Sequence, residues 1–317
     1  EYQDVFCCAL PLNHIYPMVS IVLTGMSMGV KIVTLPGFKM ETFLRAVKEY
    51  KPTYLHLVPG IMITIAKQKN LDKDLFQNIH ATFCTSAPLG STVAEQFRQA
   101  IRRPDMKIVE EYGMTETGPI VLRNPITGCE VNSVGVCVPN TFARVVDVTT
   151  GKNLGPEKSG ELVVLGPQVM KGYLNNPEAT NKMMFDDKWL RTGDLVRYNE
   201  AGHFYVMGRL KEILKVNDEQ VSPAEIEDLI RRHPNVVDVV VIGIPDEEFG
   251  ELPRAYIVRS DNSLTERDVN IFLMGKLAEF KYLKGGIDFV DKIPRTTNGK
   301  ISRKQLRSLF MESKEIK

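Results

Sequence analysis

The segment "EEYGMTETGP" (residues 110–119) places a hydroxyl and a carboxylate side by side, directly after a strand-like run. Gly113 has no side chain, so the backbone there can approach a ligand closely. Thr115 supplies the hydroxyl and Glu116 a hard carboxylate, a combination that suits phosphate together with Mg²⁺. A capped turn before a loop explains the same residues equally well.

Two further segments carry polar groups of this kind. In "WLRTGDL", Asp194 follows a glycine turn and could accept two ribose hydroxyls, although an Asp that closes a β-turn has the same pattern. In "GRLKEILK", Arg209, Lys211 and Lys215 lie close together in sequence. If that segment is helical, the two lysines share a face, which would also fit a solvated charged surface.

Two candidates stand alone. Lys300 in "PRTTNGKISRK" follows an Asn-Gly pair, as lysines of phosphate loops follow glycine, but no βα nucleotide unit precedes it. His14 in "LPLNHIYPM" lies between a predicted strand and a predicted helix, where a lone histidine is more often structural than catalytic.

The stretch "GMSMG" (25–29) matches the G-x-S-x-G elbow of serine hydrolases. That mechanism needs the serine on a sharp turn after a strand and before a helix. Here the motif ends a helix-like run and leads into a strand, so we expect Ser27 to be a helix residue without a catalytic role.

The pattern of strand-like and helix-like runs divides the chain into three regions. Up to about residue 110, strand-like runs ("DVFCCAL", "VKIVTL", "TYLHLV", "HATFCT", "MKIVEEY") alternate with helix-like runs such as "METFLRAVKEY", which predicts a parallel sheet covered by helices. Short β-rich pieces from 131 to 208 predict a small antiparallel unit. We therefore expect an α/β large-domain fragment at 1–210, with its α/β part at 1–130 and a β-rich part at 131–210.

The third region, with both helix-like and strand-like runs, predicts a small α+β C-terminal domain at 211–317. In "SPAEIEDLIRRHP", Ser222 is a helix N-cap, Pro223 occupies the first helical position and Glu225 completes a capping box. The run "LTERDVNIFLMGKLAEF" predicts a second helix with Thr265 as its cap.

Composition narrows the class of protein. The chain has 317 residues with 40 basic and 39 acidic side chains, so its net charge of +1 gives no indication of a nucleic-acid partner. Five irregularly spaced cysteines fit reduced thiols and an intracellular protein. No apolar run reaches the roughly 20 residues that span a bilayer. The last residues, "EIK", are not a peroxisomal S-K-L signal, which leaves the cytoplasm and the peroxisome open.

Seven segments in order resemble the signatures of the adenylate-forming superfamily, which includes acyl-CoA synthetases, coumarate–CoA ligases, beetle luciferases and peptide-synthetase adenylation domains. They are "LPLNHIY", "SAPLG", "YGMTE", "GELVVLGPQVMKGYLNNPEAT", "WLRTGDL", "GRLKEILKVN…QVSPAEIE" and "PRTTNGKISRK". The resemblance is strongest to the branch of coumarate–CoA ligases and luciferase-like acyl-CoA synthetases. It implies that a fatty or aryl-propenoic acid reacts with ATP to give an acyl-adenylate, and that coenzyme A then displaces AMP.

The resemblance also implies roles for single residues. It assigns the binding of ATP or AMP to Tyr112, Gly113, Thr115, Asp194, Arg209, Ser86 and Ala87, and that of Mg²⁺ to Glu116. Lys300 resembles the lysine that bridges carboxylate and phosphate during adenylation, and His14 the histidine that gates the acyl pocket. Tyr16, Ser20 and Ile120 match positions that line this pocket.

The C-terminal domain resembles a lid that swings about a hinge at Lys211. One face of such a lid brings Lys300 to the phosphate, and the other brings Lys215 and Gln220 to the thioester step. A rigid-body switch of this kind lets one domain serve two half-reactions.

The chain also departs from the family pattern. No Ser/Thr/Gly-rich phosphate loop precedes "LPLNH" and the first residue is not Met, so we hypothesise a partial sequence, impaired on its own, of a complete ligase. Glu111 replaces a pocket glycine, where a carboxylate would disfavour an apolar acyl chain unless it turned outward. Thr85 and Ser86 replace small residues, and Asp218 and Glu219 replace a glycine and an aromatic near the thioester face.

Three alternatives remain open from the sequence. The acyl acceptor could be a carrier-protein phosphopantetheine, although no carrier domain follows Lys300. The chain could also be a non-catalytic remnant of the family. A luciferin substrate is disfavoured, because "IYPMVS" after His14 does not resemble the beetle luciferin pocket. The specific acid and the oligomeric state do not follow from the sequence.

Overall fold

The computed structural model describes residues 3–68, 71–72, 74–130, 132–186, 188–217, 219–295 and 301–315. The chain divides into two compact units, Glu1–Val206 and Met207–Lys317, which are described separately below. Among the described residues, no helix has both the length and the apolar character needed to cross a membrane.

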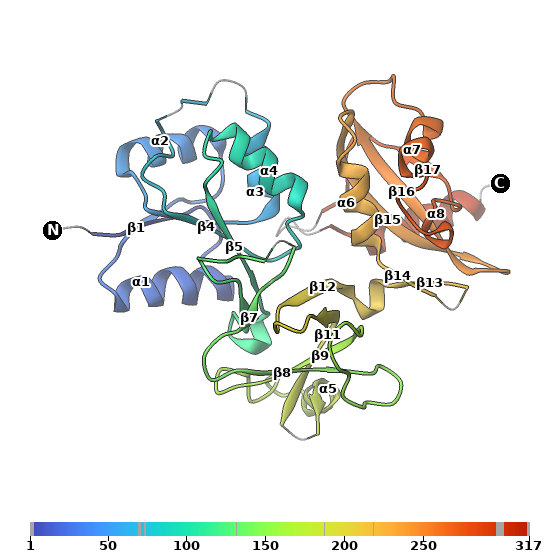
Figure 1. Ribbon diagram of the computed structural model, residues 1–317, viewed down its shortest axis with the longest axis horizontal. Coiled ribbons are helices and arrows are strands. Elements are labelled where there is room, and N and C mark those ends of the chain that lie inside the picture. Colours follow the sequence, from blue (N-terminus) through green and yellow to red (C-terminus); the bar gives the residue numbers. More distant parts are fainter. Residues whose placement is uncertain are drawn as a thin grey trace. The chain divides into compact units, whose positions relative to one another are not determined.

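The first unit is built on a mixed sheet with the strand order β2-β1-β3-β4-β5-β6-β7 (Figure 1). Its strands are β1 (Val5–Cys8), β2 (Lys31–Thr34), β3 (Tyr54–Leu57), β4 (Ala81–Cys84), β5 (Lys107–Tyr112), β6 (Leu122–Arg123) and β7 (Val136–Cys137). The first five are parallel, and β6 and β7 run antiparallel to their neighbours. The predicted alternation of strands and helices is thus confirmed.

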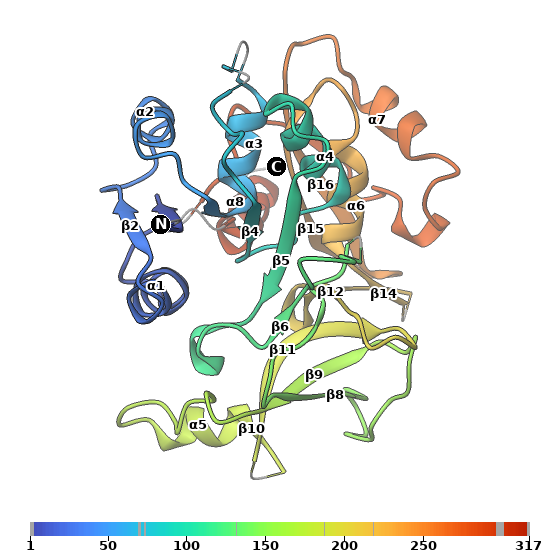
Figure 2. The ribbon, with the colours of Figure 1, turned by 60° about the vertical axis from the view of Figure 1, so that its left-hand side comes forward.

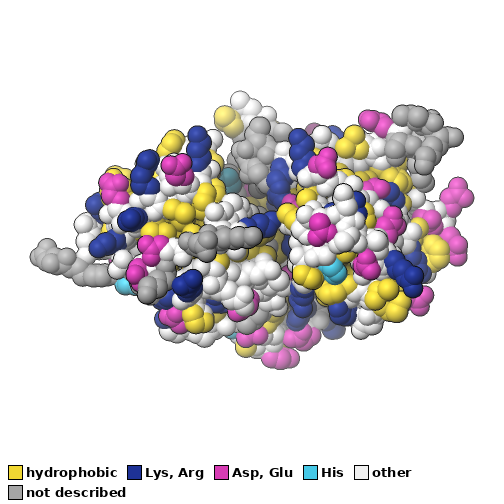
Figure 3. All heavy atoms as spheres, turned by 90° about the horizontal axis from the view of Figure 1, so that it is seen from above, with side chains coloured by type: hydrophobic (Ala, Val, Ile, Leu, Met, Phe, Trp, Pro, Cys, Tyr) yellow, Lys and Arg dark blue, Asp and Glu magenta, His cyan; other side chains and the backbone are white. Residues whose placement is uncertain are grey.

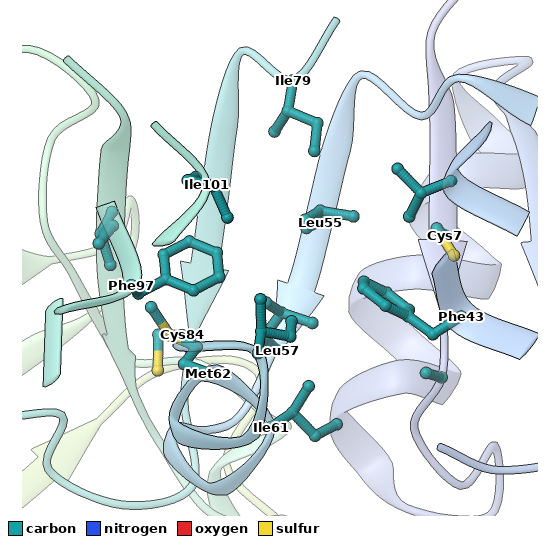
Figure 4. Packing of buried hydrophobic residues seen from close by; sticks show 14 of the residues in the cluster. Cys7, Phe43, Leu55, Leu57, Ile61, Met62, Ile79, Cys84, Phe97 and Ile101 are labelled. Carbon is teal, nitrogen blue, oxygen red and sulfur yellow. The ribbon is translucent and has the colours of Figure 1, made fainter. Parts of the chain in front are cut away.

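Three helices pack on one face of this sheet: α2 (Met40–Tyr50), α3 (Pro59–Ala66) and α4 (Ser91–Ala100). Their apolar side chains surround the buried leucines of β3, as Figure 4 shows for Phe43, Met62 and Phe97 around Leu55 and Leu57. Alternate residues of β3 point to the opposite face of the sheet, which places Tyr54 and His56 there.

The opposite face is covered at β1 and β2 by a helix whose first part is a π-helix, η1 (Pro17–Leu23), continued by α1 (Thr24–Ser27). Figures 1 and 2 show α1 and α2 on opposite sides of these strands. Ser27 ends the helix before β2, and its hydroxyl donates to the carbonyl of Thr24 at 2.8 Å. The exclusion of a hydrolase elbow therefore stands.

A second sheet of the first unit has the order β10-β11-β9-β8, with β12 paired to β11. Its strands are β8 (Phe142–Val146), β9 (Gly160–Leu165), β10 (Met184–Phe185), β11 (Trp189–Tyr198) and β12 (Phe204–Arg209), with α5 (Pro177–Met183) before β10. The pairs β8–β9, β9–β11 and β10–β11 are antiparallel, as predicted for this region.

The second unit has a sheet of order β14-β13-β16-β15, with β17 paired to β16. Its elements are η3 (Leu210–Glu212), β13 (Leu214–Val216), β14 (Glu219–Val221), α6 (Pro223–Arg231), β15 (Val236–Asp246), β16 (Gly250–Arg259), α7 (Glu266–Leu273), η4 (Glu279–Lys281), β17 (Ile287–Phe289) and α8 (Arg303–Glu315). Alternate valines of β15 serve two cores: Val239 and Val241 pack with Ile226 of α6, and Val240 with Leu306 of α8.

The two predicted N-cap residues are confirmed, but the predicted capping box at Glu225 is not. Ser222 accepts from the backbone N–H of Glu225 at 3.4 Å, but the Glu225 carboxylate binds Lys281 at 2.7 Å and does not close a capping box. Thr265 caps α7 as predicted, with Asp268 completing the box. The predicted helix was too long, since α7 ends at Leu273, two residues before a glycine with φ of 72°.

Surface charge is mixed on the face shown in Figure 3, where basic and acidic side chains are interspersed. That pattern agrees with the near-zero net charge of the sequence.

Candidate active site

The carboxyl ends of the parallel strands gather most of the predicted residues of the first unit. Ser86 and Ala87 follow β4, Gly113 and Thr115 follow β5, and His14 lies between β1 and η1. Open α/β sheets bind their ligands at this edge. The topology therefore brings together motifs that are far apart in sequence.

Tyr112 and Asp194 form the contact that joins two of these motifs. The Tyr112 hydroxyl donates to Oδ2 of Asp194 at 2.6 Å, across 82 residues of sequence. Asp194 is only 5% exposed, and its backbone N–H donates to Oγ1 of Thr192 at 3.2 Å. A buried carboxylate that is oriented in this way can accept hydroxyl donors with little further ordering.

Gly113 is required for a reason that the sequence does not reveal. A Cβ at this position would lie 1.8 Å from the carbonyl oxygen of Pro119 and 2.9 Å from Cα of Ile120. The close approach is thus to the chain's own backbone. Ile120, a predicted pocket residue, packs half-buried against the core of the first sheet.

Thr115 and Glu116 lie in a short 3₁₀ turn, η2 (Thr115–Thr117), with Thr115 exposed. Oε1 of Glu116 accepts a hydrogen bond from the Tyr173 hydroxyl at 2.6 Å. That hydrogen bond to a carboxylate is the largest cause that raises the pKa of Tyr173 to about 12. Tyr173 was not predicted as a site residue, although it lies within the quoted "KGYLNNPEAT" segment.

The sequence predicted that Glu111 would disfavour an apolar acyl chain unless its side chain turned outward. The side chain does not turn outward, and its charge is paired. Glu111 is 4% exposed, and its Oε1 accepts from Nε of Arg123 at 2.6 Å while its Oε2 accepts from the Tyr16 hydroxyl at 2.7 Å. Burial raises the pKa of Glu111, and the Arg123 guanidinium and the Tyr16 hydroxyl oppose that rise. The carboxylate is therefore buried and paired.

Tyr16 is consequently a buried member of this network, 3% exposed, and its hydroxyl also lies 2.9 Å from Nδ1 of His56. Ser20 lies half-buried within the π-helix, where backbone bonds run from i to i+5. Residues four apart share a face of a regular α-helix, but Tyr16 and Ser20 do not lie on such a face, because the backbone here is a π-helix.

His14 is held locally, because its Nδ1 accepts from the backbone N–H of Tyr16 at 3.3 Å. Ser86 is exposed and has a φ of 79°, a conformation that favours glycine. Its neighbour Ala87 is exposed too. Thr85 turns inward, and its hydroxyl donates to the carbonyl of Glu111 at 3.0 Å, so it is part of the scaffold.

The predicted residues of the second unit lie on its N-terminal strands. Lys215 and Gln220 are exposed Cα partners across the β13–β14 hairpin, so the fold brings them together. Arg209 is exposed at the end of β12, a strand that begins in the first unit and whose residues from Met207 on belong to the second. Lys211 lies in a 3₁₀ turn and Lys215 in a strand, so the helical face considered for the two lysines is wrong. Glu219 is exposed in β14.

Lys300 and Asp218 lie outside the described residues. The chain on either side of 296–300 is anchored, since Arg295 pairs with Ile301 in a β-bridge and its guanidinium binds Asp238 at 2.6 Å. Arg303 binds Glu227 at 2.5 Å, and it binds Glu212, the residue after Lys211, at 3.2 Å.

Within the described part of the chain, no group of three or more His, Cys, Asp or Glu side chains is arranged to hold a metal ion. Mg²⁺ commonly takes only one or two carboxylates and completes its shell with water and substrate phosphates. The single carboxylate of Glu116 therefore fits a cation that arrives with a nucleotide.

Sequence reasoning missed His56 and Arg123. The available signal for His56 was one polar residue inside the buried strand "YLHL". No sequence pattern pointed to Arg123, because its pairing with Glu111 depends on the antiparallel register of β5 and β6.

Comparison with known proteins gives a consistent result. The family model of the AMP-binding enzymes matches residues 1–174, and that of their C-terminal domain matches residues 225–300. The chain is 36% identical to luciferin 4-monooxygenase of Photinus pyralis and 37% identical to 4-coumarate–CoA ligase 2 of Nicotiana tabacum, over 96% of its own length in each case. It spans 55% and 57% of the lengths of these relatives.

A solved structure agrees over the same extent. ATP-bound MatB from Rhodopseudomonas palustris superposes with a TM-score of 0.90 at 32% identity, covering 97% of this chain and 60% of MatB. The family models match parts of both units, and the two relatives match 96% of the chain. Asp194 lies between the ranges that the two family models match, and its contact with Tyr112 joins two of the motifs quoted above. The chain therefore belongs to the family of AMP-binding enzymes, the adenylate-forming superfamily.

Proposed function

We propose that the protein activates a carboxylic acid with ATP, forming an acyl-adenylate and pyrophosphate, and then transfers the acyl group to the thiol of coenzyme A. The hydrogen bond between Tyr112 and Asp194 carries the proposal. It joins two segments that the family resemblance assigns to adenosine, at the sheet edge where α/β proteins bind nucleotides. ATP-bound MatB and the coumarate–CoA ligase relative support the same two co-substrates.

In this proposal the ordered carboxylate of Asp194 accepts the two ribose hydroxyls, while Tyr112 orients it and lies beside the adenine. The exposed hydroxyl of Thr115 donates to the phosphate. Glu116 would hold Mg²⁺, which when bound neutralises charge on the phosphates. Tyr173 keeps the Glu116 carboxylate in place through its 2.6 Å hydrogen bond.

The lid residues divide the two half-reactions. Lys300 places its ammonium against the carboxylate and the phosphate during adenylation, a shifting charge that suits a flexible side chain. Lys215 and Gln220, paired across the β13–β14 hairpin, act in thioester formation. A rotation about Lys211 exchanges the two faces.

The test is acid-dependent exchange between ATP and pyrophosphate, measured on the 317-residue chain and on a form extended upstream. We expect exchange in the extended form and impaired exchange in the shorter chain. Lys300→Ala should abolish exchange and spare CoA capture from preformed acyl-adenylate, and Lys215→Ala should do the reverse.

Lys304→Ala is the matched control, because Lys304 is an exposed lysine of the same region, and it should change neither half-reaction. Absence of exchange with every acid in both forms would contradict the proposal and favour a non-catalytic member of the family. Equal loss of both half-reactions in either lysine variant would contradict the assignment of two faces.

A further inference from the structure

The side chain of Glu251 holds the strand that carries Lys215. The backbone N–H of Lys215 in β13 donates to Oε2 of Glu251 in β16 at 3.0 Å, across 36 residues of sequence. Hydrogen bonds from a backbone N–H to a carboxylate are charge-assisted and stronger than those between neutral groups. Strand β13 also pairs with β16 at Val216 and Gly250, so this side-chain contact lies directly beside a main-chain pair.

The Glu251 carboxylate is itself fixed by its surroundings. Its other oxygen, Oε1, accepts from the guanidinium of Arg307 in α8 at 3.4 Å, and its side chain is only 26% exposed. Gly243 of β15 leaves the room that this carboxylate needs, because a Cβ there would lie 2.6 Å from Oε1 of Glu251 and 2.8 Å from Cδ2 of Leu214. The carboxylate therefore occupies a confined position, with one oxygen on β13 and the other toward α8.

The direction of this hydrogen bond determines how Lys215 and Gln220 face each other. The N–H of Lys215 turns toward Glu251 and therefore away from β14, so Lys215 and Gln220 form a cross-strand pair without backbone hydrogen bonds between them. Side chains lie closer together in such pairs than in hydrogen-bonded pairs. Both side chains are exposed, so Glu251 fixes the backbone from which two adjacent polar groups project into solvent.

These contacts give a role to a residue that no sequence motif indicated. We propose that Glu251 is a positioning residue for thioester formation, and that it acts by holding the β13 backbone so that the side chains of Lys215 and Gln220 stay together in the orientation that this step needs. The inference rests on the proposed function and deepens it. Adenylation is assigned to Lys300, so that half-reaction should not depend on the contact between Glu251 and Lys215.

Hydrogen exchange resolved at single amides tests the contact itself in the 317-residue chain, without any ligand. Glu251→Ala removes the acceptor, so the Lys215 amide should exchange at least about tenfold faster, because a hydrogen-bonded amide exchanges only when its bond opens. The amides that pair β15 with β16 should keep their rates, which separates this local effect from a general loss of stability. Glu247→Ala is the matched control, since Glu247 is an exposed glutamate in the turn between the same two strands, and it should change neither.

Half-reaction kinetics in the form extended upstream test the role of the contact. Glu251→Ala should slow acyl transfer from preformed octanoyl-adenylate and cinnamoyl-adenylate to coenzyme A by at least about tenfold, since a misplacement of about 1 Å can cost about a hundredfold in rate. Acid-dependent exchange between ATP and pyrophosphate should be spared. Glu251→Gln keeps an acceptor for Lys215 but turns an amide NH₂ toward Arg307, so it should restore part of the transfer rate. A merely structural role would lower transfer and exchange together, because Lys215 and Lys300 belong to the same unit.

Unchanged transfer in Glu251→Ala would overturn the inference, as would an equal loss of transfer and exchange or an unchanged rate at the Lys215 amide. If Glu251→Ala does not fold, Glu251→Leu, which fills more of the space and also lacks an acceptor, takes its place with the same outcomes. Failure of the proposed function looks different, because neither transfer nor exchange would then occur in the unsubstituted protein. Failure of this inference leaves both half-reactions in place and removes only their different dependence on Glu251.

Discussion

Replacing Arg123 by methionine tests whether the protein contains a buried carboxylate held by one guanidinium. The Glu111 side chain is 1% exposed and that of Arg123 is 45% exposed, with Nε and Oε1 2.6 Å apart. Removing one partner of a buried ion pair costs about 3–5 kcal/mol of unfolding free energy. The Tyr16 hydroxyl still donates to Glu111 in the variant, so we expect the lower end, about 3 kcal/mol.

The size of this loss depends on pH in a defined direction. Without Arg123, burial raises the pKa of Glu111 further above its unfolded value. A carboxyl group with a raised native pKa destabilises the fold as pH rises from the unfolded pKa toward the native one. The variant should therefore lose more stability at pH 8 than at pH 5.

Urea unfolding at both pH values measures the effect, with Arg197→Met as a control. Arg197 pairs with Glu157 on the surface at 2.6 Å, and such pairs contribute at most about 1 kcal/mol. The double variant Arg123→Met, Glu111→Gln should recover part of the loss and abolish its pH dependence. Equal costs at Arg123 and Arg197, or a loss independent of pH, would refute the assignment of Glu111 as a buried paired carboxylate.

Three further perturbations follow from the structure. Gly113→Ala should lower the free energy of unfolding by several kcal/mol, because the new Cβ would meet a backbone carbonyl oxygen at 1.8 Å. Gly37→Ala is the control, because the space around Gly37 is open, and similar urea midpoints for the two variants would count against this prediction. Burial raises the pKa of Glu110 to about 7, so the free energy of unfolding should fall as pH rises from about 4.5 to 7, and Glu110→Gln should remove roughly 3 kcal/mol of that dependence; parallel pH profiles of the two proteins would contradict it. Arg303→Met leaves the buried Glu227 without this partner and should destabilise the second unit by about 3 kcal/mol, monitored by hydrogen exchange on α6; unchanged protection would contradict it.

The fold followed from the sequence where local pattern and long-range packing agree. The helix α2 coincides with the predicted run "METFLRAVKEY" because one apolar stripe, containing Phe43 and Val47, meets the sheet. The predicted helix after Thr265 was too long, because apolar spacing continues past Leu273 while the backbone does not.

The sequence predicted which segments contribute to the site, but not the contacts between their side chains. The order of the motifs predicted that Tyr112 and Asp194 belong to one site, yet their hydrogen bond depends on how two sheets meet. The inward turn of Glu111 and its pairing with Arg123 depend on the register of β5 and β6, which no local pattern encodes. Pairing across a sheet is a tertiary property, and for this reason His56 and Arg123 were missed.

The claim that the carboxyl edge of the first sheet binds a nucleotide is tested most directly by calorimetry of Mg·ATP with the 317-residue chain. We expect saturable binding that Asp194→Ala weakens by at least about tenfold, the equivalent of 1.4 kcal/mol. Asp147→Ala, which removes a half-buried aspartate that accepts from the backbone N–H of Thr150 in a turn, should leave the affinity unchanged. The absence of Mg·ATP binding, or binding that Asp194→Ala does not weaken, would contradict the account.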